Sequence, residues 1–130
     1  MPFQCNRAYF VSRLKAIAAQ GQSIWLDYIR RDMVDDGSLE RLIAEDGISG
    51  LTSNPAIFEK AIAASTLYDA SLAGHVHEGQ QDPEQLVEAL AIEDIRMAAD
   101  AFWPVYQATQ GKDGYVSLEV SPRLASDTAR

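Results

Sequence analysis

Residues 47–60, "GISGLTSNPAIFEK", pass from a short apolar run to the start of a helix within a few positions. The run at 48–52 predicts a buried strand. Asn54 then predicts a helix N-cap and Pro55 the first helical position, where its missing N–H leaves no hydrogen bond unmade. Polar side chains at the carboxyl ends of parallel strands also meet ligands, so this stretch is a candidate binding site as well as a cap.

A second strand candidate precedes this stretch. Residues 23–27, "SIWLD", are nearly all apolar until the run ends on Asp27, which is typical of a strand buried in a parallel sheet. Between the two strands, Ser38 predicts an N-cap and Gly47 a helix end. A strand, a helix and a second strand form a βα unit, which indicates a parallel sheet.

The rest of the chain continues the same alternation. Apolar spacing predicts a lead-in helix over 8–19 and another helix over 55–64, followed by a polar connection over 65–81. Asp82 and Pro83 predict the start of a long helix that Pro104 should kink or end. Its predicted apolar stripe consists of Val87, Ala91, Ile95, Ala98 and Phe102.

A third strand is predicted within "GYVSLEVSP", residues 114–122, because apolar and polar side chains alternate there. Three strands then end near Asp27, Asn54 and Glu119, and in a parallel sheet these three side chains lie at one rim. Buried carboxylates are unfavourable unless they are paired or used, so two of them at one rim favour a proton-transfer site. Ordinary helix caps and rim residues are the alternative interpretation.

Composition limits the class of protein. The chain has 130 residues, 47% of them hydrophobic, and a net charge of -8, which favours one globular core and argues against general affinity for nucleic acid or anionic membrane. The single cysteine forms no internal disulfide, and no run is long enough to span a bilayer. Arg7, Arg13 and Lys15 interrupt any signal-peptide core, so we expect a reducing, cytoplasmic location.

Three segments resemble the transaldolases, specifically the longer bacterial type that is sometimes fused to a phosphoglucose isomerase. They are "WLD" at the first strand, "GLTSNPAIF" at the second and "GYVSLEVSPRLASDT" at the third. The resemblance implies an α/β fold made of the first three βα units of a (β/α)8 TIM barrel, with residues 1–22 as a helical lead-in and 23–130 as the partial barrel. The expected strands lie near 23–27, 48–52 and 115–120.

The resemblance also implies an activity. Transaldolases transfer a dihydroxyacetone unit from a ketose phosphate, such as sedoheptulose 7-phosphate or fructose 6-phosphate, to an aldose phosphate in the pentose phosphate pathway, using a lysine Schiff base and neither metal nor organic cofactor. Asp27 matches the general base, and Glu119 the acid/base that acts through a water. Asn54 matches the residue that binds the three-carbon fragment, with Thr52 and Ser53 beside it as substrate-binding candidates.

The chain departs from the family at the nucleophile. The family's Schiff-base lysine lies on the fourth strand, and the three lysines here, Lys15, Lys60 and Lys112, are not predicted at the rim. We therefore expect the chain to be inactive alone and to expose sheet edges through which it could self-associate. A fructose-6-phosphate aldolase and a non-catalytic interaction fragment are the alternative functions.

Other polar and aromatic residues are interpreted without a chemical role. His75 and His77 are expected in a solvated loop, with no metal site. Arg30 and Arg31 are expected at a solvated helix start. The two tryptophans, Trp25 and Trp103, are expected to pack in the core or barrel.

Overall fold

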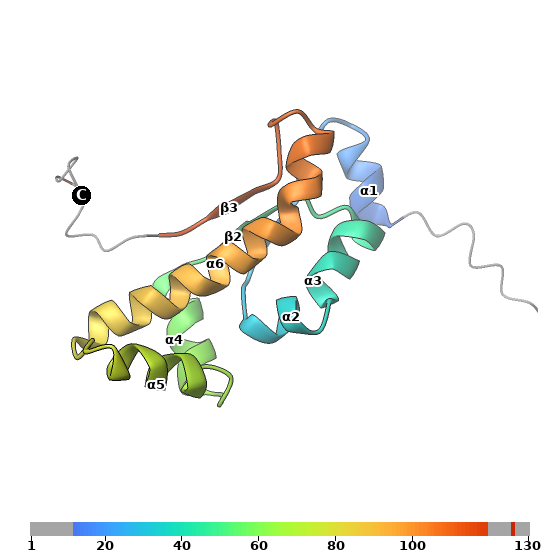
Figure 1. Ribbon diagram of the computed structural model, residues 1–130. Helices are drawn as coiled ribbons and strands as arrows, with labels where there is room; N and C mark the ends of the chain where they lie inside the picture. Colours follow the sequence, from blue (N-terminus) through green and yellow to red (C-terminus); the bar gives the residue numbers. More distant parts are fainter. Residues whose placement is uncertain (1–11, 120–125, 127–130) are drawn as a thin grey trace, which may run out of the picture.

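The computed structural model describes residues 12–119 and 126, and these residues form an open, three-stranded parallel sheet with helices beside it (Figure 1). The strands are β1 (Trp25–Asp27), β2 (Gly50–Thr52) and β3 (Tyr115–Ser117), in the order β1-β2-β3. Each falls within its predicted range. The α/β class and the parallel pairing predicted from the βα pattern are confirmed.

The register aligns the strands in layers. Trp25 pairs with Gly50 and Gly50 with Tyr115, while Asp27 pairs with Thr52 and Thr52 with Ser117. Alternate residues face opposite ways along a strand. The layer between these two, which is formed by Leu26, Leu51 and Val116, therefore points to the other face, where all three side chains join the hydrophobic core.

Short helical segments fill the connection between β1 and β2. Helix α1 (Arg13–Ala18) precedes β1, and the part of the expected lead-in helix over residues 8–11 lies outside the described residues. The connection contains α2 (Arg31–Asp35), α3 (Ser38–Arg41) and the π-helical turn η2 (Leu42–Asp46). Gly47 ends this turn as predicted, with a φ of 74° that favours glycine.

The predicted cap at Ser38 is wrong, because Ser38 is the first residue of α3 and Gly37 precedes it as the N-cap. The Ser38 amide instead donates to the carboxylate of Asp36, at 2.8 Å. An aspartate two residues upstream therefore satisfies the amide for which a serine cap was expected.

The connection between β2 and β3 contains α4 (Pro55–Ala63), α5 (Asp69–His77) and α6 (Pro83–Ala108). The polar connection predicted over 65–81 is thus partly wrong, since it holds the nine-residue helix α5. The Asp82 cap of α6 is confirmed by its side chain, which accepts from the Glu84 amide at 3.0 Å.

Pro104 neither ends nor interrupts α6, which continues to Ala108. Pro104 lacks the amide hydrogen that would otherwise bond to the Asp100 carbonyl. Both residues are exposed. Water can therefore satisfy that carbonyl, which explains why the predicted helix end is wrong. The predicted kink stays a prediction.

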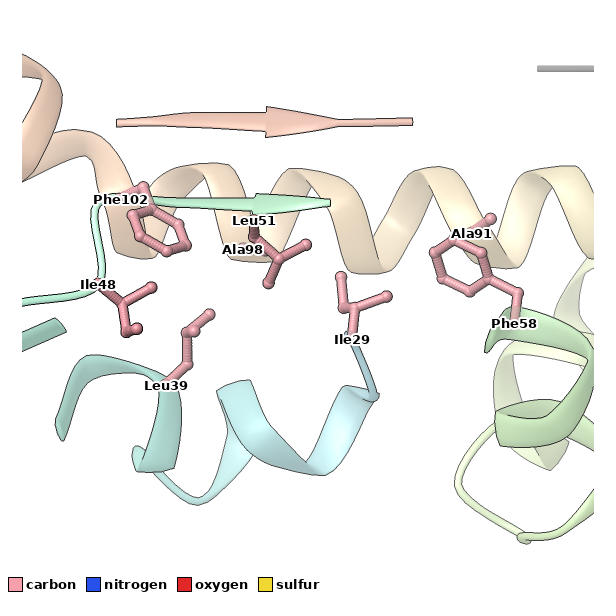
Figure 2. Packing of buried hydrophobic residues seen from close by; sticks show 8 residues of the cluster. All are labelled: Ile29, Leu39, Ile48, Leu51, Phe58, Ala91, Ala98 and Phe102. Atoms are coloured by element: carbon pink, nitrogen blue, oxygen red, sulfur yellow. The ribbon is translucent and has the colours of Figure 1, made fainter. Parts of the chain in front are cut away.

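Figure 2 shows the main core, in which α6, β2 and the connection after β1 meet. Phe102 and Ala98 of α6 lie near Leu51 of β2, and Ala91 lies against Phe58 of α4. The core cluster consists of Ile29, Leu39, Ile48, Leu51, Phe58, Ala91, Ala98 and Phe102. Val87, which was predicted in the stripe, is 39% exposed.

The sheet face opposite this core is open in the described part of the chain. Trp25 and Tyr115 are 37% and 46% exposed there, and Trp25 covers Gly50. Trp103 is 54% exposed and stacks on Tyr106, with ring centroids 5.3 Å apart. The core position expected for Trp103 is therefore wrong within the described residues, and Trp25 packs on the sheet while it stays partly open to solvent.

Candidate active site

Asp27 is the last residue of β1 and points to the open face of the sheet. The Thr52 hydroxyl at the end of β2 donates a hydrogen bond to Asp27 Oδ1 at 2.8 Å. Asp27 itself is exposed. The parallel register thus brings together two of the predicted site residues, and the hydroxyl fixes one oxygen of the carboxylate while the other is available to accept a proton.

Asn54 begins α4, as its position before Pro55 predicted. Its Oδ1 accepts from the Ile57 amide at 3.0 Å, which confirms the capping role. The opposite end of the same side chain, Nδ2, carries two N–H donors. An asparagine that is half-buried and oriented by its cap can present these donors in a fixed direction.

Ser53 is placed differently from its neighbours. It is 1% exposed, and its hydroxyl donates to the Ser117 carbonyl at 2.8 Å. This bond joins the ends of β2 and β3. The structure therefore gives Ser53 a role in holding the rim together, whereas Asp27 and Thr52 lie on the open face.

Glu119 lies two residues beyond Ser117, just as Asn54 lies two residues beyond Thr52. Leu118 packs against the core while Ser117 and Glu119 are exposed, so the alternation predicted for this segment continues past the end of β3. Both residues follow the carboxyl ends of their strands, beyond the layer that holds Asp27. The fold thus brings Asp27, Asn54 and Glu119 to the same end of the sheet.

The three lysines lie on elements other than the strands. Lys15, on α1, donates to the Ala44 carbonyl at 2.5 Å, and its side chain lies beside Gly47. Lys60 is exposed on α4, and Lys112 is exposed in the turn before β3. That none of these lysines supplies the Schiff base stays a prediction.

The sequence interpretation missed a polar cluster around Arg31, four residues after Asp27. Arg31 is 8% exposed and Asp94 fully buried, so the solvated helix start predicted for Arg31 is wrong. Arg31 Nε donates to Asp94 Oδ1 at 2.7 Å, and the Tyr68 hydroxyl donates to Asp94 Oδ2 at 2.6 Å. Burial raises the pKa of the Asp94 carboxyl and the pKa of the Tyr68 hydroxyl.

The cluster extends from Arg31 to the surface through Glu93. Arg31 Nη2 donates to Glu93 Oε2, and His75 Nε2 contacts Glu93 Oε1, both at 2.8 Å. His75 is thus on a helix and paired, so its predicted place in a solvated loop is wrong, whereas His77 is exposed on the same helix. We call Arg31, Tyr68, Ser71, His75, Glu93 and Asp94 the Arg31 cluster.

One sequence signal could have revealed this cluster. Asp94 falls between Ala91 and Ala98 on the apolar side of α6, where a carboxylate requires a buried partner.

Among the described residues, no group of three or more His, Cys, Asp or Glu side chains could hold a metal ion. A search of the same part of the chain finds no helix that is long and apolar enough to cross a membrane.

Comparison with known proteins agrees with this arrangement. A family model described as transaldolase/fructose-6-phosphate aldolase matches residues 24–130, which include all three strands and the rim. The chain belongs to this family. Its open α/β sheet corresponds to the βα units of a partial TIM barrel.

Several relatives carry the name transaldolase. The chain is 50% identical over 115 residues to that of Thiobacillus denitrificans, which is 88% of this chain and 32% of the relative. It is 45% identical over 117 residues to that of Trichodesmium erythraeum (90% and 30%) and 46% identical over 119 residues to that of Thermobifida fusca (92% and 32%). The chain therefore spans about a third of the length of these relatives.

Proposed function

We propose that this chain is the amino-terminal part of a transaldolase, which transfers a dihydroxyacetone unit from a ketose phosphate to an aldose phosphate in the cytoplasmic pentose phosphate pathway. The observation that carries the proposal is the Asp27–Thr52 pair at the carboxyl end of a parallel sheet, in a chain whose relatives are named transaldolase. In (β/α)8 barrels this end of the strands carries the active site.

In this proposal Asp27 is the general base. A lysine Schiff base makes the donor carbon an electron sink, and the Asp27 carboxylate takes the proton of the C4 hydroxyl as the neighbouring carbon–carbon bond breaks. The bonding electrons pass to the iminium, and the aldose leaves. Thr52 supports this role, since its hydrogen bond holds one carboxylate oxygen in place.

Glu119 and Asn54 serve the same intermediate in the proposal. Glu119, exposed beyond β3, transfers protons through a water while the carbinolamine loses or regains its hydroxyl. Asn54 donates from Nδ2 to the hydroxyl groups of the three-carbon fragment, while Oδ1 keeps its cap on α4. Capping thus gives the asparagine a fixed orientation for binding.

The chain itself is proposed not to form the Schiff base. Its lysines lie on α1, on α4 and in the turn before β3. The resemblance assigns the nucleophile to a fourth strand. Completing the catalytic set therefore needs the part of the relatives that this chain does not span.

Borohydride trapping tests the proposal. We would join this chain to the remaining two thirds of the Thiobacillus denitrificans transaldolase and incubate the chimera, and separately the 130-residue chain, with fructose 6-phosphate and borohydride. Mass spectrometry should find a covalent three-carbon adduct on the chimera and none on the chain alone. Labelling of Lys15, Lys60 or Lys112 would show that the nucleophile lies in this chain and that its assignment to a fourth strand is wrong.

Fructose-6-phosphate aldolase is the second candidate, because the matching family's description includes it. That reaction ends with release of free dihydroxyacetone, whereas a transaldolase passes the fragment to an aldose phosphate. Adding erythrose 4-phosphate to the chimera separates them: formation of sedoheptulose 7-phosphate supports the transaldolase, and unchanged release of dihydroxyacetone supports the aldolase. A chimera that folds but neither traps nor turns over would favour the non-catalytic fragment.

A further inference from the structure

Arg31, the centre of the Arg31 cluster, lies four residues after the proposed general base, Asp27. Asp27 ends β1, and Arg31 begins α2, so the segment between them is a short link from the rim to a helix. Ile29, in the middle of this link, is 1% exposed and belongs to the main core. The direction of the backbone at Asp27 therefore depends on the contacts that hold the link at Ile29 and Arg31.

Arg31 is held more completely than a surface ion pair would be. Its Nε, Nη1 and Nη2 atoms each donate to a different partner: Asp94 at 2.7 Å, Ser71 at 2.7 Å and Glu93 at 2.8 Å. The guanidinium also lies over the Tyr68 ring, 4.5 Å from its centroid. Two helices, α5 and α6, and the segment before α5 thus fix a single side chain in one orientation.

A buried ion pair of this kind is weak support for stability, because desolvation offsets much of its attraction. It does impose geometry, since a guanidinium with three separate partners has few alternative positions. Within the described residues, no buried side-chain nitrogen or oxygen lacks a hydrogen-bond partner. A fully paired network that anchors the backbone next to a proton-transfer residue restricts the orientation of that residue.

We propose that Arg31 is a positioning residue for Asp27: anchored by Asp94, Glu93 and Ser71, it fixes the link 27–31 and thereby the direction of the Asp27 carboxylate at the rim. Thr52 holds the carboxylate from the neighbouring strand, and Arg31 holds the backbone that follows it. The inference rests on the proposed function of Asp27, but its test measures geometry and needs no turnover.

The test uses NMR on the chimera with the Thiobacillus denitrificans transaldolase, isotope-labelled in the 130 residues of this chain, and on its Arg31→Met variant. In the unsubstituted chain the backbone order parameters of residues 28–30 should be those of rigid structure, about 0.85, and in the variant they should fall below about 0.6. The Asp27 carboxyl carbon resonance should shift, because the hydrogen bond from Thr52 is no longer held. Leu51, in the core of β2, should keep its order parameter in both.

Two further variants separate positioning from general stability. Arg30→Met is the matched control, because Arg30 precedes Arg31 but pairs with Asp32 through a side chain that is 43% exposed. It should leave the Asp27 resonance unchanged. Arg31→Lys keeps the positive charge but not the planar guanidinium that donates to three separate partners. It should therefore restore only part of the backbone order at residues 28–30 that Arg31→Met removes.

Ser71→Ala keeps the test decisive if Arg31→Met does not fold, because it removes one partner of Arg31 and leaves Asp94 paired. It should move the Asp27 resonance and the order of residues 28–30 in the same direction, by less. Equal loss of order at Leu51, an unmoved Asp27 resonance, or a flexible link in the unsubstituted chain would each overturn the inference. Loss of borohydride trapping in the chimera would instead overturn the proposed function.

Discussion

Asp27 and Glu119 have different proposed tasks, although both are exposed carboxylates at one end of the sheet. In the chimera with the Thiobacillus denitrificans transaldolase, Asp27→Ala should suppress carbon–carbon cleavage while adduct formation continues. Glu119→Ala should slow the formation of the adduct itself. Loss of a positioned acid/base group lowers rates by about 10² to 10⁴. Stopped-flow assays and timed trapping would measure the two steps separately, and turnover within a few-fold of the parent for both variants would contradict the roles.

Gly50 is the position where a single methyl group should disturb the sheet. A Cβ placed there would lie 2.3 Å from the Trp25 ring, because the indole covers Gly50 on the open face. Gly50→Ala should therefore displace the indole and destabilise the fold by about 1–3 kcal/mol. Urea unfolding followed by circular dichroism, together with tryptophan fluorescence, would measure both effects.

Gly74 supplies the control for that substitution. It lies inside α5, and a Cβ there would meet nothing within 4 Å. Gly74→Ala should stabilise the chain by about 0.5–1 kcal/mol through helix propensity alone. If the two alanine substitutions changed stability by the same amount and sign, the contact between Trp25 and Gly50 would have no energetic weight.

At the scale of the elements, α5 depends on polar contacts more than on packing. None of its residues is buried, and its side chains reach the rest of the fold through Leu72, Ser71 and His75. Burial acts to raise the pKa of Glu93, but hydrogen bonds from His75, Ser71 and Arg31 outweigh it and hold that pKa below its ordinary value. The attachment of α5 to α6 should therefore weaken in acid.

The sign of this pH dependence follows from the lowered pKa. A carboxylate of this kind contributes stability that is present above its unfolded pKa, about 4.3 for glutamate, and is lost as the pH falls through the lower folded value. Glu93→Gln should thus destabilise the chain at pH 7, and the difference from the parent should shrink toward pH 3. Urea unfolding across that range would show this. Glu88→Gln, on the exposed side of α6, is the control for the loss of one negative charge. A difference in stability between Glu93→Gln and the parent that stays constant with pH would contradict the assignment.

The sequence predicted the strands and the rim better than it predicted the helices around them. Asp27, Asn54 and the parallel βα unit follow from local signals: apolar runs that end on polar residues, and a cap before a proline. The helix α5 has no buried side chain, so no apolar periodicity marks it. Arg31 looked solvated because its partners Asp94 and Glu93 lie 63 and 62 positions further along the chain, and only the tertiary fold reveals such pairs.

At the scale of the whole molecule, the open sheet is the dominant feature. Strands β1 and β3 form the two edges, and Trp25 and Tyr115 lie partly exposed on the uncovered face. Bare edges of a parallel sheet pair readily with other strands, and a barrel normally removes them by closing. We therefore expect the isolated chain either to be only marginally folded or to associate through these edges.

A lysine on an edge strand tests association directly, since charged side chains block edge pairing. Ser117→Lys adds an exposed charge to β3, and Gln107→Lys adds the same charge to an exposed position on α6. Sedimentation equilibrium should show self-association of the parent and of Gln107→Lys. The association constant of Ser117→Lys should be lower by about tenfold or more, because each loss of about 1.4 kcal/mol from an interface weakens affinity tenfold. Urea unfolding of the dilute parent should show low stability. A dilute monomer that unfolds cooperatively, with the free energy of unfolding of an ordinary domain, roughly 5–15 kcal/mol, would contradict the expectation. The open edges would then neither destabilise the chain nor cause association.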